Sequence, residues 1–176
     1  MARNVEIKAR LSDINIQRNI ALQLSESEPV LIQQEDVFFK TNKGRLKLRF
    51  FNERSGELIS YDRTDKRGPK TSEYYIFKTD NPLELNAVLE HNMGILQKVK
   101  KRRELFIAGR TRIHIDQVDL LGDFLELEVV LNEGDSFEDG EKIANELMAK
   151  LQIPSNSLID KAYVDLLIEK TNGLEE

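Results

Sequence analysis

The sequence contains no cysteine, and its only histidines are His91 and His114. Without cysteine the chain can form no disulfide, thiolate metal site or cysteine nucleophile. Two histidines are too few for a multi-histidine zinc site, so any metal ion must be held mainly by carboxylates. No apolar run is long enough to span a bilayer, and the N-terminus alternates charged and apolar residues instead of forming a signal peptide. These absences predict a cytoplasmic protein that does not bind a membrane.

The composition is that of a folded domain. The 176 residues are 40% hydrophobic and 32% charged, which provides a core and a heavily charged remainder within one domain, residues 1–176. The net charge of −5 disfavours a protein that binds nucleic acid through overall positive charge.

The net charge conceals a segregation of the two signs along the chain. Residues 40–70 carry ten basic and four acidic side chains, and residues 98–112 carry seven basic and one acidic. Residues 113–141 contain ten acidic side chains and no Lys or Arg. Such runs are ordinarily solvated faces, but they also suit a site that needs both signs.

Most of the chain shows the two-residue periodicity of β-strands, with glycine at the short connections. Strands are predicted over residues 5–11, 30–40, 45–51, 57–63, 73–79, 96–107, 111–118 and 123–131. Helices are predicted from Asp13 to about residue 27, with Leu22 near the buried side, and over residues 82–92, 136–151 and 157–170. The prediction is one α+β domain of eight mostly antiparallel strands, which a closed or nearly closed barrel would leave without edges.

The alternation within strands assigns the charged side chains to faces. Glu126 and Glu128 lie opposite Leu125 and Leu127, and Asp116 must share their face because paired strands share an apolar face. Carboxylates that crowd one sheet face repel one another. Together with the shortage of histidine, this predicts a bound Mg²⁺ or Mn²⁺ ion.

Basic side chains follow the same rule on other strands. Lys47 and Arg49 alternate with leucines, Glu6 and Lys8 share one face, and Tyr61 and Arg63 share another. In the basic run at residues 100–103, alternation alone does not decide which side chains point inward. The residues leave two interpretations open: an open sheet with a solvated charged face, or a closed sheet whose lumen binds a polyphosphate and its metal ion.

An ordered set of segments resembles the CYTH domain, the family of triphosphate tunnel metalloenzymes that includes class IV adenylyl cyclases, thiamine triphosphatases and inorganic tripolyphosphatases. The family signature Glu-x-Glu-x-Lys is matched by NVEIK at residues 4–8. The other matching segments are QEDVFF (34–39), LKLRF (46–50), LISYDR (58–63), KRRELF (101–106), RIHID (112–116), LGDFLELE (121–128) and AYVDLL (162–167). The resemblance covers nearly the whole chain in the right order.

The resemblance implies an eight-stranded antiparallel tunnel and a role for each matching charged residue. The cations implied to bind the triphosphate are Lys8, Lys47, Arg49, Arg63, Lys101 and Arg103. The carboxylates implied to coordinate one or two Mg²⁺ or Mn²⁺ ions are Glu6, Asp116, Glu126 and Glu128. The departure is Asn4, where the family has a glutamate, and this bears on a second metal ion because the amide offers a metal only its carbonyl oxygen.

Three activities fit such a tunnel. The first, favoured by the segments at residues 114–116 and 121–124, is a class IV adenylyl cyclase that converts ATP to cyclic AMP and pyrophosphate. The second is a hydrolase of tripolyphosphate, thiamine triphosphate or a nucleoside triphosphate, and the third is a non-catalytic polyphosphate-binding module. We expect a small triphosphate as the partner rather than nucleic acid, and a homodimer is compatible with the sequence.

The remaining distinctive residues have structural interpretations. His114 is expected to be a satisfied polar side chain rather than a ligand, and His91 to interact with the end of a helix. Phe38 and Tyr61 are candidates to border a base or a thiamine ring, but packing within the barrel is the favoured interpretation. The basic run that begins at Lys100 precedes an acidic hairpin, which disfavours a nucleic-acid contact.

Overall fold

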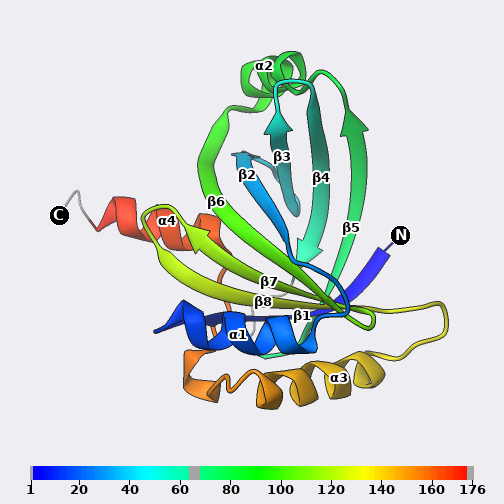
Figure 1. The fold of residues 1–176 in the computed structure, drawn as a ribbon. Coiled ribbons are helices and arrows are strands. Elements are labelled where there is room, and N and C mark those ends of the chain that lie inside the picture. Colours follow the sequence, from blue (N-terminus) through cyan, green and yellow to red (C-terminus); the bar gives the residue numbers. More distant parts are fainter. Residues whose placement is uncertain (1, 64–67, 174–176) are drawn as a thin grey trace.

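Eight antiparallel strands close into a barrel in the computed structural model, which describes residues 2–63 and 68–173. The strand order around the barrel is β1-β5-β4-β3-β2-β6-β7-β8 (Figure 1). The strands are β1 (Ala2–Arg10), β2 (Val30–Phe39), β3 (Arg45–Asn52), β4 (Ser55–Arg63), β5 (Lys70–Thr79), β6 (Ile95–Ala108), β7 (Thr111–Val118) and β8 (Gly122–Val130). The predicted antiparallel barrel is confirmed.

Four α-helices flank the barrel. They are α1 (Ile14–Leu24), α2 (Pro82–Met93), α3 (Phe137–Lys150) and α4 (Tyr163–Asn172), with a short 3₁₀ turn over Ser155–Ser157. Helices α1 and α3 lie beneath β1, β7 and β8, whereas α2 covers the opposite end of the barrel (Figure 1). None of the described helices is both long and apolar enough to cross a membrane.

On β1 and β8 the apolar faces point outward, toward the helices. Val5 and Ile7 of β1 and Leu127 of β8 are fully or almost fully buried, and they pack with Leu147 and Leu151 at the C-terminal end of α3. The alternating charged residues of the same strands therefore face the lumen. Of the two interpretations that the residues left open, the closed sheet with its charged face inward is the one that the structure shows.

The strand register places the charged side chains opposite one another. On β1 and β8, Lys8 pairs with Glu126 and Glu6 with Glu128. On β7 and β8, His114 pairs with Glu126. The prediction that the acidic face of β8 meets the polar face of β7 is confirmed.

Two of the helix predictions are wrong in detail. Helix α1 ends at Leu24, and Leu22 is 38% exposed, because the buried stripe of this helix runs through Gln17 and Ala21. The last helix begins at Tyr163 rather than at residue 157. The preceding residues are extended: Leu158 forms a bridge with Ala9, and the Ile159 amide donates to the Lys8 carbonyl.

Candidate active site in the barrel tunnel

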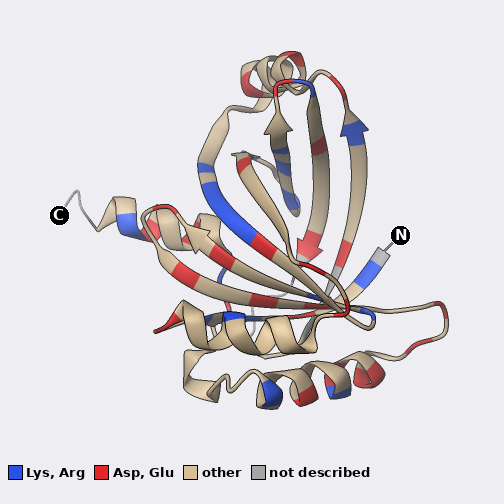
Figure 2. Cartoon of the chain, viewed as in Figure 1, with Lys and Arg blue, Asp and Glu red and all other residues tan. Residues whose placement is uncertain are grey.

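The lumen of the barrel is a cavity of about 460 Å³ lined by side chains from all eight strands and by Ala162 and Tyr163. Its wall has three chemically distinct sectors. A cationic sector lies on β3 and β6, around Asp36 of β2. An acidic sector on β1 and β8 holds Glu6, Glu126 and Glu128, with Lys8 and the neighbouring Arg112 and His114 of β7. An apolar and aromatic sector lies on β4 and β5, which also contribute Glu57. Figure 2 shows the basic segments of β3 and β6 and the acidic segments of β7 and β8 around this space.

The cationic sector is organised by a buried carboxylate, Asp36. Lys47 Nζ lies 2.9 Å from Asp36 Oδ2, and Arg49 donates through Nε at 2.8 Å and Nη2 at 2.9 Å. Burial alone would raise the pKa of Asp36, but the charges of Arg49 and Lys47 prevail and hold it well below its ordinary value. The carboxylate therefore stays ionised and fixes both cations on the tunnel wall.

Lys101 belongs to the same sector and is almost fully buried. Burial, followed by repulsion from Arg103, lowers the pKa of the Lys101 ammonium from 10.5 to about 7. Its Nζ lies 5.2 Å from the centre of the Tyr163 ring. A bound polyanion would favour the protonated form.

Arg103 connects the cationic and acidic sectors. It binds Asp116 through two hydrogen bonds of 2.6 Å and reaches Glu126 Oε2 at 2.9 Å. The Tyr163 hydroxyl donates to Asp116 Oδ2 at 2.8 Å. Burial disfavours the ionised form of Asp116, but Arg103 lowers its pKa overall. Asp116 is fully buried, and both of its oxygens accept hydrogen bonds from the protein.

The acidic sector centres on Glu126 and Glu128. Lys8 Nζ lies 2.8 Å from Glu126 Oε1, and Arg112 Nη2 lies 2.7 Å from Glu128 Oε2. Burial would raise the pKa of Glu126, but the positive charges of Lys8 and Arg103 help to hold this pKa well below its ordinary value. These cations already offset the carboxylate repulsion that the sequence pattern predicts, so repulsion alone does not require a metal ion.

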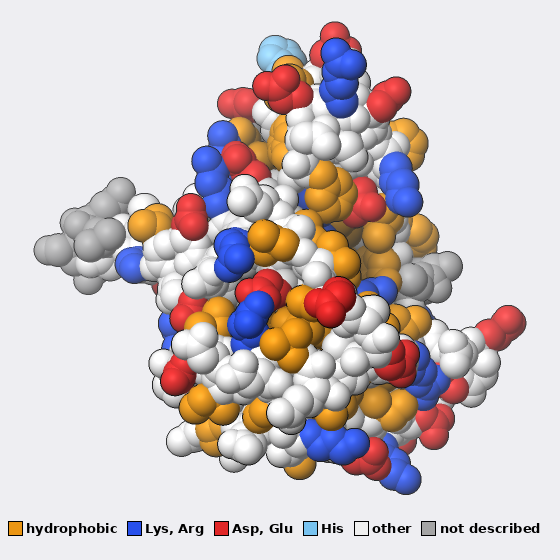
Figure 3. Space-filling view, in the orientation of Figure 1, with side chains coloured by type: hydrophobic (Ala, Val, Ile, Leu, Met, Phe, Trp, Pro, Cys, Tyr) orange, Lys and Arg blue, Asp and Glu red, His pale blue; other side chains and the backbone are white. Residues whose placement is uncertain are grey.

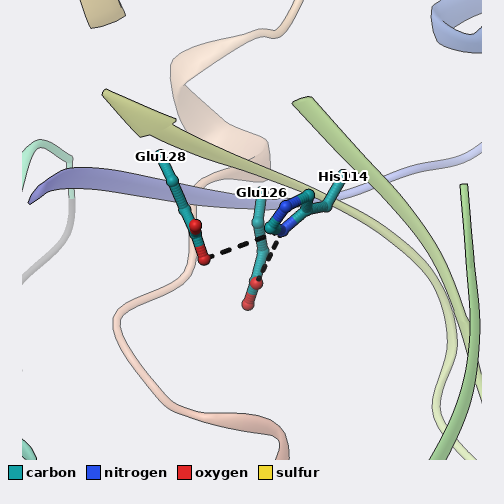
Figure 4. A group of neighbouring side chains, drawn as sticks. All are labelled: His114, Glu126 and Glu128. Carbon is teal, nitrogen blue, oxygen red and sulfur yellow. Dashed lines mark ion pairs between the residues drawn. The ribbon is translucent and has the colours of Figure 1, made fainter. Parts of the chain in front are cut away.

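A second feature of the acidic sector does fit a metal ion. His114 Nδ1 lies 3.9 Å from Glu126 Oε2 and 3.7 Å from Glu128 Oε1 (Figure 4). One ligand atom from each of the three residues lies within 4.8 Å of the others. Among the described residues, the buried Nδ1 has no hydrogen-bond partner. Two carboxylates and a vacant imidazole nitrogen form a donor set suited to a divalent cation.

The apolar sector lies on the neighbouring strands β4 and β5. Ile59 pairs with Ile76 across these strands, and Tyr61 pairs with Tyr74. Phe38 of β2 also lines the cavity. Part of the tunnel thus offers surface for an uncharged portion of a ligand.

Most of the residues predicted for the site are together in the tunnel. The wall includes Glu6, Lys8, Lys47, Arg49, Lys101, Arg103, Glu126 and Glu128. Asp116 lies beside them, bound to Arg103 and Tyr163. The backbone of Arg63 ends β4, but its side chain lies outside the described part of the chain.

Several polar residues of the site were not predicted from the sequence, and Asp36, Tyr163 and His114 are three of them. Asp36 lies beside Val37, Phe38 and Phe39, where apolar residues on both faces erase the alternation. Tyr163 belongs to a helix, for which the strand rule gives no direction. His114 was expected to be a satisfied side chain, but its Nδ1 lacks a partner among the described residues; its position opposite Glu126 was the available signal.

Comparisons with known proteins agree with this architecture. The CYTH domain model matches residues 2–163. A Methanocaldococcus jannaschii protein named "putative adenylate cyclase" is 26% identical, over 92% of this chain and 97% of that protein. A structure from Pyrococcus horikoshii superposes with a TM-score of 0.82 at 22% identity, covering 93% of this chain and 98% of the other.

A second structure has a similar fold. It is a Hippeastrum "putative adenylyl cyclase" described as having a dominant triphosphatase activity. Its TM-score is 0.67 at 15% identity, with 96% of each chain covered. The family match over nearly the entire chain and the closed charged tunnel lead to one assignment: the chain belongs to the CYTH domain family.

Proposed function

We propose that this chain is a metal-dependent enzyme that binds ATP in its tunnel and converts it to cyclic AMP and pyrophosphate. The observation that carries the proposal is the division of the tunnel wall into cationic, acidic and apolar sectors. A nucleoside triphosphate presents an anionic chain and a weakly polar base, whereas inorganic tripolyphosphate has nothing to place against Ile59, Tyr61 and Ile76. The name of the M. jannaschii relative supports the same activity.

The cations of the tunnel would bind the phosphate chain. Lys8, Lys47, Arg49, Lys101 and Arg103 all line the cavity, and Arg63 completes the proposed set. Guanidinium groups bind phosphate oxygens through paired charge-assisted hydrogen bonds. Asp36 and Asp116 hold three of these cations in place before the ligand arrives.

The acidic sector would hold the metal ion. Glu126 and Glu128 are the central ligands, with Glu6 and Asp116 as the other proposed carboxylates. Bound Mg²⁺ or Mn²⁺ would neutralise negative charge on the phosphates and on the leaving pyrophosphate. Asn4 of β1, two residues before Glu6, stands where the family signature has a glutamate. The missing carboxylate favours one bound metal ion over two.

Hydrolysis of a triphosphate is the second candidate, because it requires the same cations and carboxylates. The Hippeastrum protein of the same fold favours it, since a dominant triphosphatase activity is described for that protein. The third candidate is a binding module without catalysis, for which Asn4 is the argument.

The products separate these activities. The protein would be incubated with Mn²⁺ and ATP, and in parallel with tripolyphosphate and thiamine triphosphate. Cyclic AMP and pyrophosphate in equal amounts would support the cyclase. Orthophosphate without cyclic AMP would instead establish hydrolysis, and triphosphate binding without any product would establish the binding module.

A variant in the acidic sector tests the metal assignment in the same assay. We expect Glu126→Gln to lower turnover by about 10²-fold or more, because the site loses a charge that stabilises the bound metal ion. Glu133→Gln, an exposed acid after β8, is the matched control and should turn over normally. Unchanged turnover of Glu126→Gln would remove Glu126 from the metal site. The cytoplasmic location and the homodimer stay predictions.

A further inference from the structure

His114 is a buried imidazole with an unmet bonding requirement. The residue is 4% exposed and lines the tunnel from β7. Among the described residues, its Nδ1 has no hydrogen-bond partner. A buried polar atom left without a partner destabilises the structure, so such an atom in a ligand cavity calls for a partner that comes with the ligand.

The position of His114 distinguishes it from the other unpartnered atoms of the tunnel. Asn4 Oδ1 and Gln34 Oε1 are likewise buried without a partner in the described part of the chain. Among the His, Asp and Glu side chains of the described residues, His114 forms a compact group with two carboxylates, since its ligand atom and those of Glu126 and Glu128 lie within 4.8 Å of one another. Figure 4 shows the imidazole directed toward both carboxylates.

The separations are those of atoms around a common ion. Nδ1 is 3.9 Å from Glu126 Oε2 and 3.7 Å from Glu128 Oε1, beyond hydrogen-bond distance. Ligands about 2.1 Å from an octahedral cation are about 3 Å apart when adjacent and about 4.2 Å apart when opposite. The distances from Nδ1 to the two carboxylate oxygens fall between these limits, so the three side chains are close enough to share one ion.

We propose that His114 supplies a nitrogen ligand to the cation held by Glu126 and Glu128, and that this site therefore selects Mn²⁺ over Mg²⁺. The inference rests on the proposed function, because it concerns the metal of the same tunnel. Mg²⁺ is bound by oxygen ligands in an octahedral shell, whereas first-row transition ions also accept imidazole. Lys8, Arg103 and Arg112 already offset the carboxylate charges, so the cation should bind most tightly together with a triphosphate.

Electron spin-echo spectroscopy of bound Mn²⁺ tests the proposal directly. The full chain would be loaded with Mn²⁺ and a triphosphate whose two bridging oxygens are replaced by methylene groups, which prevents turnover. We expect modulation from an imidazole ¹⁴N in the unmodified protein and its loss in His114→Asn. His91→Asn, on the exposed surface of α2, is the matched control and should keep the signal.

Metal affinities give an independent readout. Titration calorimetry should show that His114→Asn weakens Mn²⁺ binding at least tenfold and Mg²⁺ binding less than threefold. An equal loss for both ions would overturn the selectivity. Mn²⁺ bound without ¹⁴N modulation in the unmodified protein would overturn the ligand assignment, and this measurement needs no variant to fold.

Two further measurements test the proposed function independently of the ligand role of His114. Calorimetry with the methylene-bridged triphosphate alone reports on the cationic sector, and product analysis with ATP reports on catalysis. Metal-dependent product formation without a nitrogen ligand would show that His114 is not a metal ligand, but the proposed enzymatic function would stand. Absence of both metal and triphosphate binding would overturn the enzyme and this inference together.

Discussion

At the scale of single residues, the tunnel wall is organised by ion pairs between buried carboxylates and the cations proposed to bind phosphate. Asp36 binds Lys47 and Arg49, and Asp116 binds Arg103. Buried ion pairs seldom stabilise a fold beyond what apolar residues would provide, but removing one partner leaves an uncompensated charge. Their role here is to hold cations at fixed positions before a polyphosphate binds.

Asp36→Asn should expose this role. The variant leaves Lys47 and Arg49 without their carboxylate, so we expect the free energy of unfolding to fall by about 3 kcal/mol. Tripolyphosphate should restore more stability in the variant than in the unmodified protein, because the anion replaces the lost charge. Urea unfolding with and without tripolyphosphate measures both effects.

Glu35→Gln is the control for that experiment. Glu35 is adjacent in sequence, but its carboxylate is partly exposed and lies 3.5 Å from the exposed Lys100. An exposed pair contributes less than about 1 kcal/mol. Equal destabilisation by the two substitutions would contradict the special role of Asp36.

Lys101 should couple triphosphate binding to proton uptake. Its ammonium has a pKa of about 7 in the free protein, so above that pH the group is mostly neutral. A bound polyanion raises this pKa, and binding at pH 8 should therefore take up a proton at Lys101. Calorimetry in buffers of different ionisation enthalpy measures the protons exchanged.

Lys101→Arg separates this effect from the titration of the ligand. Arginine stays charged across the range, so the variant should lack the uptake due to Lys101 and bind with a flatter pH profile. Between pH 6 and pH 8.5, we expect the triphosphate affinity of the unmodified protein to fall by about tenfold more than that of Lys101→Arg. The reason is that the charge-assisted contact of Lys101 weakens as the ammonium loses its proton. Identical proton exchange in both proteins would exclude Lys101 as the titrating group.

The alternation of apolar and charged residues correctly predicted which side chains face the tunnel wherever one face of a strand is apolar. It placed Lys47, Arg49, Glu126 and Glu128 correctly, because leucines alternate with them. It gave no answer in the basic run at residues 100–103, where the resemblance indicated Lys101 and Arg103. Neither approach could show that Lys8 and Arg112 would pair with the acidic residues, because partner choice depends on register.

At the scale of elements, strand and helix bounds could be predicted to within a few residues except near the C-terminus. Leu158 and Ile159 continue a helical spacing of apolar residues in the sequence, yet they pair with β1 as extended chain. Local spacing cannot report such a tertiary contact. The segment matters to the site because it leads into Ala162 and Tyr163 at the tunnel wall.

Helix α3 depends on a close approach to β1 at Gly140. A Cβ atom at this position would lie 2.5 Å from Val5 Cγ2 and 2.7 Å from Leu131 Cδ2. Overpacking of this kind costs about 1–3 kcal/mol, which exceeds or offsets the gain of about 1 kcal/mol in helix propensity. We expect Gly140→Ala to lower stability by about 1 kcal/mol.

Urea unfolding of Gly140→Ala would measure that change. Glu146→Ala, at an exposed position of the same helix, gains helix propensity without the clash and should unfold at or slightly above the unmodified midpoint. A Gly140→Ala variant more stable than the unmodified protein would show that α3 shifts away from β1 at no cost.

At the scale of the whole molecule, part of the charge segregation of the sequence is expressed inside the barrel. Figure 3 shows basic and acidic side chains interspersed on the outer face in view. The described side chains that line the tunnel include six Lys and Arg and five Asp and Glu, so their charges nearly cancel, and the net charge of −5 arises elsewhere on the chain. Barrel closure could be predicted from the number of strands, but their order could not, because β1 pairs with both β5 and β8.

An interior built of carboxylate ion pairs should make the whole barrel sensitive to acid. Asp36, Asp116, Glu126 and Glu128 all have pKa values below their ordinary ones of 3.8 and 4.5. The unfolded chain therefore binds these protons first as the pH falls. The stability that the four groups contribute is complete above about pH 4.5 and is lost progressively as the pH falls through their folded pKa values.

Thermal unfolding between pH 7 and pH 3 tests this origin of acid lability. We expect the melting temperature to fall steeply below about pH 4.5, and to fall less steeply in an Asp36→Asn, Glu126→Gln double variant, which starts lower but has fewer protons to take up. The exposed pair Glu133→Gln, Glu138→Gln serves as the control and should keep the unmodified slope. Equal slopes in both double variants would place the acid-sensitive groups outside the tunnel.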